Sequence, residues 1–303
     1  MSLSVAGRKR RVGPWAAALA GALLALPSAV LAGPPVVLVE GRVGPYREAA
    51  LAIKKHLPDA VFSDPGTPGL DLANASLIVA VGQKSLNLAR TQPATVPVVF
   101  CMVLGVGKDT LAQHVTGVPL ESDPVLGLKR LTRIAPRARR VGVIVNPDAN
   151  ELWLGESQRA ATSLGLQLVV KSVQSASEVK GAINGLVGGV DALWLPPDPR
   201  LFSKEVFAFL LGFASERKLP LIGFLDSFTQ AGALASVSAD YTDIGNRAGK
   251  LAAQILAQGE GRRLPVPAPV FAPGNLTLNQ KTASALGISL SPQVVGEAHQ
   301  VFQ

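Results

Sequence analysis

Apolar residues along this chain alternate between short continuous runs and longer stretches in which every third or fourth residue is apolar. The clearest example spans residues 139–171. Residues 141–145 form an apolar, β-branched run that stops at Asn146-Pro147, which predicts a buried strand followed by a turn. Apolar residues then recur at helical spacing until Gly165, and residues 166–170 form another apolar run. This stretch predicts one strand-helix-strand unit.

The same alternation continues on both sides of that unit. It predicts further strands at 35–39, 60–62, 76–81, 96–103, 191–195, 220–224 and 234–237, with helices between most of them. A long helix is expected at 240–259, a short one at 281–286, and an extended, proline-spaced connector or edge strand at 265–271. Repeated strand-helix alternation indicates an α/β protein whose parallel sheets carry helices on both faces.

Several polar residues stand where predicted helices begin. Asp148 with Glu151, and Ser175 with Glu178, have the spacing of capping boxes, and Ser203 is expected to cap a third helix.

Other polar residues follow the predicted strands directly. Asn146, Asp198 and Asp226 each come after one, and Gly82-Gln83-Lys84-Ser85 follows the strand at 76–81. The carboxyl ends of parallel strands share one edge of a sheet, where helix N-termini also point, and ligands bind in the crevice beyond that edge. We therefore expect these residues to lie at a binding rim.

The first 32 residues differ from the rest. Four basic residues at 8–11 precede an apolar stretch at 15–26 and a small-residue cleavage signal, Val30-Leu31-Ala32, which predicts a secretory signal peptide. A membrane anchor is the alternative, but the apolar run is shorter than the ~20 residues that span a bilayer. Cleavage would lower the formal net charge from +8 to +4, and a charge of this size does not indicate binding to nucleic acid. No cysteine stands directly after the cleavage site, so lipoprotein attachment is not expected.

The remaining chain, about 270 residues, exceeds the usual size of one hydrophobic core and favours two lobes. The only cysteine, Cys101, cannot form an internal disulfide bond and lies in an apolar run, so we interpret it as a buried core residue.

No pattern in the sequence indicates catalysis. The three histidines are far apart, and neither a zinc motif, a Gly-x-Ser-x-Gly elbow nor a dinucleotide fingerprint is present. Gly105-x-Gly107-Lys108 lacks the full phosphate-loop spacing and is interpreted as a plain loop. We expect a binding protein without a metal or other cofactor.

From Arg140 to Ile288 the chain resembles the tryptophan/tyrosine-type substrate-binding proteins of ABC importers. The N-terminal part matches in pattern only, through residues 78–82, 96–100 and 116–117. The better-matching segments include Val141-Gly-Val-Ile-Val-Asn146-Pro147, Gly232-Ala-Leu-Ala235, Asp240-Tyr241 with Gly245, and Ala285-Leu-Gly-Ile288.

The resemblance implies the type I periplasmic binding protein fold, in which two similar α/β lobes are joined by a three-stranded hinge. It places chain crossings near Gly117, Val237 and Pro265. The expected lobes are 33–118 with 239–265, and 119–238 with 266–303. A small molecule, such as an amino acid or related compound, would be held between the lobes of a periplasmic monomer and delivered to an inner-membrane permease.

The expected ligand-binding residues come from two sources, the predicted rim positions and the positions that correspond to the family. Where the family has an Asn-Ser pair at the start of a helix, this chain has Asn150-Glu151, and Leu104-Gly105 replaces an Asp-Pro pair. Asp198 and Asp226 are candidates for a ligand ammonium, and the helix start at 82–85 for a carboxylate. The expected set is Gly82, Gln83, Ser85, Asn146, Asn150, Asp198 and Asp226.

Two alternatives stay open at this point. A periplasmic sensor or interaction module would close on its ligand in the same way but signal to a membrane receptor, and gene neighbourhood would separate it from an importer. The weakly matching first lobe is also compatible with a protein that has lost its ligand.

Overall fold

A computed structural model of the chain describes residues 1–2, 33–41, 44–259 and 264–303. The expected signal peptide therefore lies almost entirely outside the described residues. Within these ranges, no helix combines the length and apolar character needed to cross a membrane.

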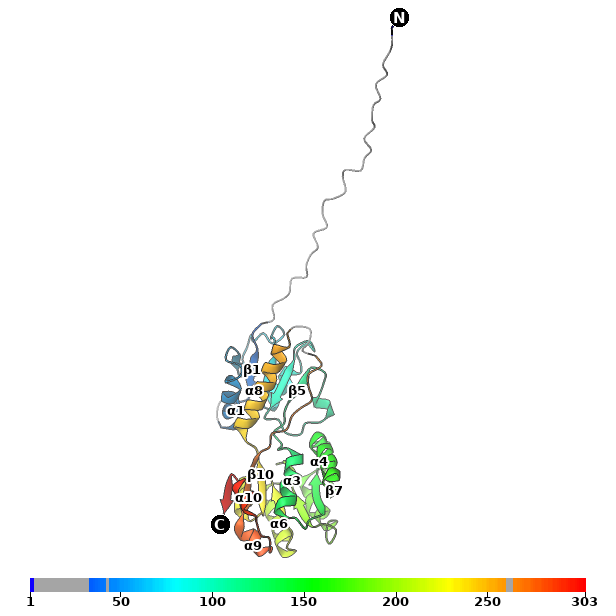
Figure 1. The fold of residues 1–303 in the computed structure, drawn as a ribbon, viewed down its shortest axis with the longest axis vertical. Helices are drawn as coiled ribbons and strands as arrows, with labels where there is room; N and C mark the ends of the chain where they lie inside the picture. The colour runs from blue at the N-terminus through cyan, green and yellow to red at the C-terminus, as the bar shows by residue number, and fades with distance from the viewer. Residues whose placement is uncertain (3–32, 42–43, 260–263) are drawn as a thin grey trace. The chain divides into compact units, whose positions relative to one another are not determined.

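The first sheet has five parallel strands in the order β2-β1-β3-β4-β5. Alternate residues of each strand point to opposite faces, and both faces are buried. Helices α1 and α8 pack side by side on one face, and α2 packs on the other (Figure 1). The elements are β1 (Val36–Val39), α1 (Pro45–Lys54), β2 (Val61–Ser63), β3 (Ile78–Val81), α2 (Gln83–Ala89), β4 (Val98–Cys101), the 3₁₀ helix η1 (Lys108–Thr110), β5 (Val115–Val118) and α8 (Tyr241–Ala257).

The second sheet has seven strands in the order β12-β11-β10-β9-β8-β6-β7. Strands β6 to β10 are parallel, β11 is antiparallel to β10, and β12 runs parallel to β11. Helices α3 and α4 cover one face, and α5 and α6 cover the other. The elements are α3 (Pro124–Ile134), β6 (Arg140–Val145), α4 (Glu151–Ser163), β7 (Gln167–Ser172), α5 (Ala176–Asn184), β8 (Ala192–Trp194), α6 (Lys204–Glu216), β9 (Leu221–Gly223), α7 (Asp226–Ala231), β10 (Ala235–Ser238), β11 (Asn275–Asn279), α9 (Gln280–Ala285), α10 (Pro292–Gly296) and β12 (Gln300–Phe302).

Three segments connect the two sheets, and they pack against one another. They follow β5, follow β10 and precede β11, and we call residues 119–123, 239–240 and 272–274 together the hinge. Asp123 N donates to Ala272 O at 2.7 Å. A Cβ at Gly274 would lie 2.6 Å from Ser238 O, so the third segment passes too close to the end of β10 for any side chain.

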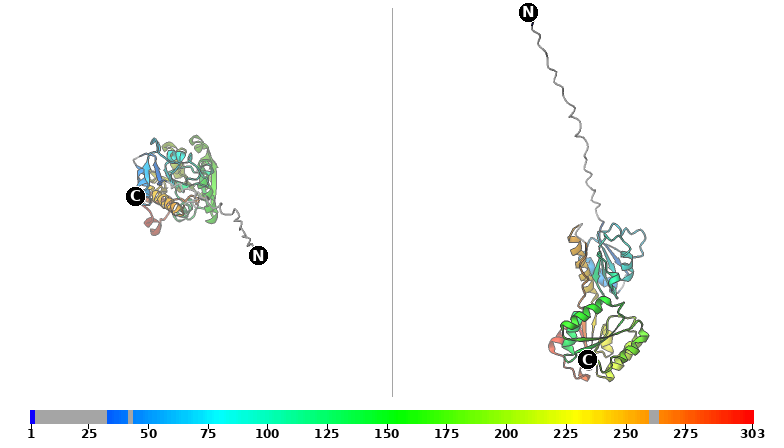
Figure 2. Two further views of the ribbon diagram at one scale, coloured as in Figure 1. Left: turned by 90° about the horizontal axis from the view of Figure 1, so that it is seen from above. Right: turned by 90° about the vertical axis from the view of Figure 1, so that its right-hand side faces the viewer.

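The second connecting segment leads back to the first sheet. Helix α8 comes late in the chain, but its residues Ile244 and Ala248 belong to the core of the first lobe. Figure 2 shows this helix, in orange, against the blue and cyan strands. The resemblance implied that the helix at 240–259 returns to the first lobe, and the structure confirms this return.

The structure confirms the α/β alternation and corrects the expectations in four places. Strands β5, β11 and β12 were not predicted. The segment 266–272, expected in the second lobe, lies along β5, where Val266 N donates to Gln113 O and Val270 N to Gly117 O. The third crossing therefore comes near Gly274 rather than Pro265. Asp148 forms no capping box, because α4 begins only at Glu151 and follows Asn150.

The fourth correction concerns Ser175 and Glu178. Ser175 precedes α5 but its side chain accepts no backbone hydrogen bond. Glu178 reaches back one residue further than expected, to Gln174 N at 3.2 Å. Ser203 caps α6 as predicted, because its Oγ accepts from Val206 N at 3.4 Å.

Replacing Gly245 by alanine tests the contact between α1 and α8. A Cβ there would lie 2.7 Å from Ala49 Cα, so the helices must separate, and we expect a loss of about 1–3 kcal/mol in unfolding free energy. Gly212→Ala in α6 is the matched control, because a Cβ there meets nothing within 4 Å, and it should leave stability unchanged or raise it by about 1 kcal/mol. Equal denaturation midpoints for the two variants would contradict the close packing.

Candidate functional site

Asp198 is the most deeply buried carboxylate at the rim of the second sheet. It follows β8, which ends before Pro196-Pro197, and its side chain is only 1% exposed. Arg200 binds it through two side-chain nitrogens, with Nε 3.0 Å from Oδ1 and Nη2 3.2 Å from Oδ2. Asn150 Nδ2 donates to Oδ2 at 3.1 Å. Asp198 is thus a buried charge that is fully paired within the chain.

Asn146 and Asn150 belong to the same cluster. Asn146 Oδ1 accepts from the backbone nitrogens of Asp148 and Ala149, at 3.1 and 3.2 Å, so its side chain shapes the loop that follows β6. Its carbonyl oxygen accepts from Asn150 Nδ2 at 3.1 Å. Asn150 is buried, and its Oδ1 has no partner in the structure. The expected residues Asn146, Asn150 and Asp198 therefore lie together.

Glu121, which the sequence did not single out, joins this cluster from the hinge. Its Oε1 accepts from Gly105 N at 2.7 Å, and its Oε2 is buried without a partner. Burial raises the pKa of the Glu121 carboxyl to about 7. The hydrogen bond from Gly105 opposes this increase, and the charge of Asp198 adds to it.

The loop after β4 meets the loop after β6 beside Glu121. Gly105 has φ +72° and a Cβ there would lie 2.7 Å from Ala149 O, so only glycine fits. Lys108 N donates to Glu151 Oε2 at 2.9 Å, and Leu152 N donates to Val106 O at 3.3 Å. The start of α4 is thus docked against the first lobe.

The helix start at 82–85 carries an acid of its own. Glu40 Oε2 accepts from Lys84 N at 2.8 Å, and Lys84 Nζ lies 3.6 Å from Glu40 Oε1. Ser85 is completely buried, and Gln83 Nε2 donates to Asn87 on the helix surface. The Glu40 carboxylate binds at the helix start that the sequence analysis assigned to a ligand carboxylate, and the ligand-binding role of Gly82, Gln83 and Ser85 stays a prediction.

Asp226 begins α7 at the end of β9. Its Oδ1 is buried and has no hydrogen-bond partner in the structure. Tyr241, the first residue of α8, lies in the range of its charge. Burial raises the pKa of the Tyr241 phenol, and the negative charges of Glu48 and Asp226 raise it further. Acidic groups of α1 and α7 thus lie near this tyrosine.

A cavity of about 140 Å³ lies at the rim of the second sheet, and Asp198, Glu121 and Asp226 are not among the residues that line it. It is bounded by the carboxyl ends of β8, β9 and β10 and by the segments that follow β4 and β5. Phe224, Leu225 and Tyr241 form its aromatic and aliphatic wall. The other lining residues are Leu104, Leu120, Ser122, Pro197, Pro199, Val237, Ser238 and Ala239. The sequence analysis did not identify these residues, and three of them, Leu120, Ser122 and Ala239, come from the hinge.

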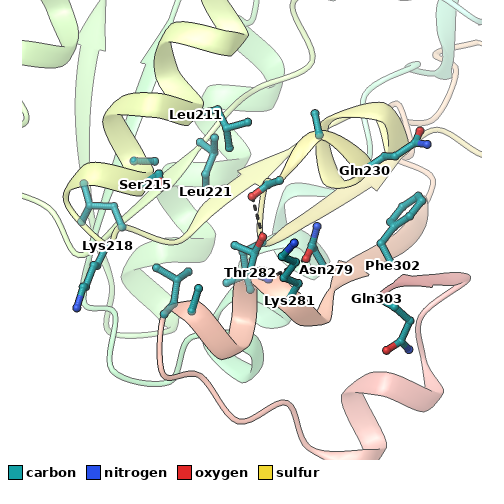
Figure 3. Close-up of a pocket in the computed structure, with 17 residues that line it drawn as sticks. Leu211, Ser215, Lys218, Leu221, Gln230, Asn279, Lys281, Thr282, Phe302 and Gln303 are labelled. Carbon is teal, nitrogen blue, oxygen red and sulfur yellow. Dashed lines mark hydrogen bonds between the residues drawn. The ribbon is translucent and has the colours of Figure 1, made fainter.

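A larger cavity, of about 690 Å³, lies at the other end of the second sheet, near the first residue of β9 (Figure 3). Leu211 and Leu221 face Thr282 and Asn279 across it. Two of its polar side chains are engaged within the chain, because Thr282 Oγ1 donates to Gly232 O at 3.0 Å and Asn279 Nδ2 to Thr229 O at 2.9 Å. Ligand crevices of α/β sheets lie at the carboxyl ends of the strands, so the smaller cavity is the candidate site.

Comparison with solved structures shows the fold. One neighbour is an ABC domain in complex with L-Trp from Streptococcus pneumonia, with a TM-score of 0.59, 20% identity, and coverage of 88% of this chain and 98% of that one. Another is the ligand-free, open structure of a substrate-binding protein with adhesive properties from Clostridium difficile, with a TM-score of 0.60, 20% identity, and coverage of 89% and 98%. The expected type I periplasmic binding protein fold is confirmed.

Comparison with known sequences points the same way. A tyrosine-binding protein from Clostridioides difficile (strain R20291) is 27% identical over 222 residues, which is 69% of this chain but only 62% of that relative's length. Residues 70–302 match the family described as ABC transporter substrate binding protein, whose members are binding proteins and not enzymes. The chain belongs to this family of ABC transporter substrate-binding proteins.

Proposed function

We propose that this protein is the exported solute-binding component of an ABC importer, and that it closes on a small molecule in the 140 Å³ cavity and delivers it to an inner-membrane permease. The cavity between the two rims is the observation that carries the proposal. It joins residues from both lobes and the hinge, so occupancy by a ligand would favour the closed arrangement of the lobes.

The proposed ligand is an amino acid or a related compound that carries an amine. The tyrosine-binding relative supports an amino-acid-like ligand. Three side chains of the rims and the hinge, those of Asp226, Asn150 and Glu121, each have a buried acceptor oxygen without a partner, and such oxygens suit the N–H donors of an ammonium.

The proposal also includes export and oligomeric state. The protein is exported through a signal peptide cleaved near Ala32 and acts as a monomer in the periplasm. The basic and apolar pattern of residues 8–32 supports export. Mass spectrometry of the mature protein and light scattering test these two points directly.

A thermal-shift panel of amino acids and amines, followed by calorimetry of each hit, tests the function itself. A ligand present at 100 times its Kd should stabilise the protein by about 2.7 kcal/mol. If no small molecule in the panel raises the melting temperature, the proposed function is wrong.

Asp198→Ala should weaken binding of the identified ligand at least ten-fold, because it leaves Arg200 and Asn150 without the partner that orients them at the rim. Asp191→Ala is the matched control. Asp191 pairs with Arg140 at the opposite end of the same strand, β8. It should lower stability but leave ligand affinity unchanged. Equal affinities for the two variants would remove Asp198 from the site.

Glu121→Gln tests the buried acid through the pH dependence of stability. The folded-state pKa of about 7 exceeds the ordinary glutamate pKa of 4.5, so the folded protein binds more protons between these two pH values and loses stability as pH rises through them. At 1.4 kcal/mol per pH unit, the total loss is about 3 kcal/mol. Urea denaturation from pH 4.5 to 8 should show this loss in the natural protein and not in the variant. A constant difference between the two proteins across that range would contradict the raised pKa.

A further inference from the structure

Glu121 is a buried acid in the hinge, and it has no basic partner. Only 2% of the residue is exposed. Its Oε1 accepts from Gly105 N at 2.7 Å, and its Oε2 is buried without a partner. It forms no ion pair within the described part of the chain. A buried carboxylate without a counter-charge is strongly unfavourable, and binding a proton removes its charge.

The charged groups that act on Glu121 come from the second lobe. Asp198 and Arg200 both stand in the segment after β8, and Arg200 makes three hydrogen bonds to Asp198. The positive charge of Arg200 is therefore largely balanced by that acid. The charge of Asp198 raises the pKa of the Glu121 carboxyl and that of Arg200 lowers it, but burial is the largest influence and raises it.

The other charged groups around the hinge are engaged elsewhere. Lys108, in the loop that contains Gly105, pairs with Glu151 at the start of α4. Asp123, on the same hinge segment as Glu121, caps α3 by accepting from two backbone nitrogens. Neither pairs with Glu121, so a proton is the simplest means of neutralising it.

The groups around Glu121 belong to different lobes. Gly105 lies in the loop after β4 of the first lobe, whereas Asp198 and Arg200 belong to the second. A Cβ at Gly105 would lie 2.7 Å from Ala149 O and 3.7 Å from Arg200 Nη2, so this loop rests directly against the second lobe. Separation of the lobes would part these groups and bring water to the Glu121 carboxyl. The closed arrangement therefore contributes to its burial.

We propose that the protein takes up a proton at Glu121 when its lobes close, so that acidic conditions favour the closed form and strengthen its hold on the ligand. This inference rests on the proposed function and adds its regulation by pH. A neutral Glu121 keeps the hydrogen bond from Gly105, because the carbonyl oxygen of a carboxylic acid still accepts.

The direction of the effect follows from the two states of Glu121. In the open form water solvates the carboxylate, and its pKa returns toward the ordinary value of 4.5, whereas in the closed form the pKa is about 7. Closure therefore binds a proton between these two pH values. The closed form has its full advantage below pH 4.5 and loses it as pH rises through 7.

Small-angle X-ray scattering of the mature protein without any ligand tests the link to closure. We expect a smaller radius of gyration at pH 5 than at pH 8. Glu121→Gln has a side chain of the same shape that stays neutral, so it should keep the smaller radius at both pH values. Glu297→Gln is the matched control, because it removes a partly exposed acid of the second lobe that pairs with Arg133, and it should behave like the natural protein. Equal radii of the natural protein at the two pH values would overturn the inference.

Isothermal titration with L-tyrosine as the probe tests the effect on binding. The natural protein should bind tyrosine at least about ten-fold more tightly at pH 5 than at pH 8, because the two pKa values of Glu121 differ by more than one unit. Near pH 6 it should take up close to one proton per tyrosine, measured from the binding heat in buffers of different ionisation enthalpy. Glu121→Gln should bind equally at both pH values and take up no proton. Ionisation of tyrosine itself would affect both proteins alike.

The outcomes separate this inference from the proposed function. If tyrosine binds with the same affinity at both pH values, or if Glu121→Gln keeps the full pH dependence, the inference is wrong and the proposed function stands. If tyrosine does not bind, the scattering result alone decides the inference. The proposed function fails only if no small molecule of the wider panel binds.

Discussion

The site depends on how the chain passes three times between its two sheets. The first and third hinge segments contact each other through the hydrogen bond from Asp123 to Ala272, and Gly274 of the third approaches Ser238, the last residue before the second. Arg130 of α3 donates to the carbonyl oxygens of Pro273 and Gly274, so the third segment is also held by the second lobe. Each hinge segment is joined directly to the end of a strand or to the start of one. The hinge therefore fixes the positions of the rims of both sheets. Leu120 and Tyr241 line the cavity for this reason.

Most acidic side chains at the rims are paired with a basic side chain of the chain itself, so an acid without such a partner stands out. The acids Asp198, Glu40 and Glu151 each have a basic partner, whereas Asp226 forms no ion pair within the described part of the chain. An acid that is paired in the ligand-free protein has little to gain from a cationic ligand. An acid with a buried, unpartnered oxygen gains a hydrogen bond and a counter-charge together. Asp226 is therefore distinguished by its environment rather than by its position in the sequence.

The sequence predicted the second lobe well and the cavity poorly, for identifiable reasons. Strands such as β6 and β8 are continuous apolar runs that end at proline, so both their existence and their rim residues, Asn146 and Asp198, could be recognised. Strand β5 contains Thr116 and Gly117 and lacks such a run, so Glu121 beyond it could not be placed at a rim. The same limit applies to Glu40, because nothing in the sequence brings it to the start of α2, 44 residues away. Contacts between distant segments decide the site, and local spacing does not encode them.

The direct contacts between the lobes outside the hinge are weak, which makes the ligand decisive for closure. The pair of Lys108 and Glu151 is largely exposed, with the lysine side chain 88% accessible, so water and salt screen it. The hydrogen bond from Leu152 to Val106 is long, at 3.3 Å. A ligand shifts the balance between open and closed forms only by its difference in affinity for them. A ligand that contacts Leu104 and Tyr241 of the first lobe and Phe224 of the second would make these contacts together only when the lobes are closed. The closed form would then report occupancy of the cavity, which is the information a membrane partner needs.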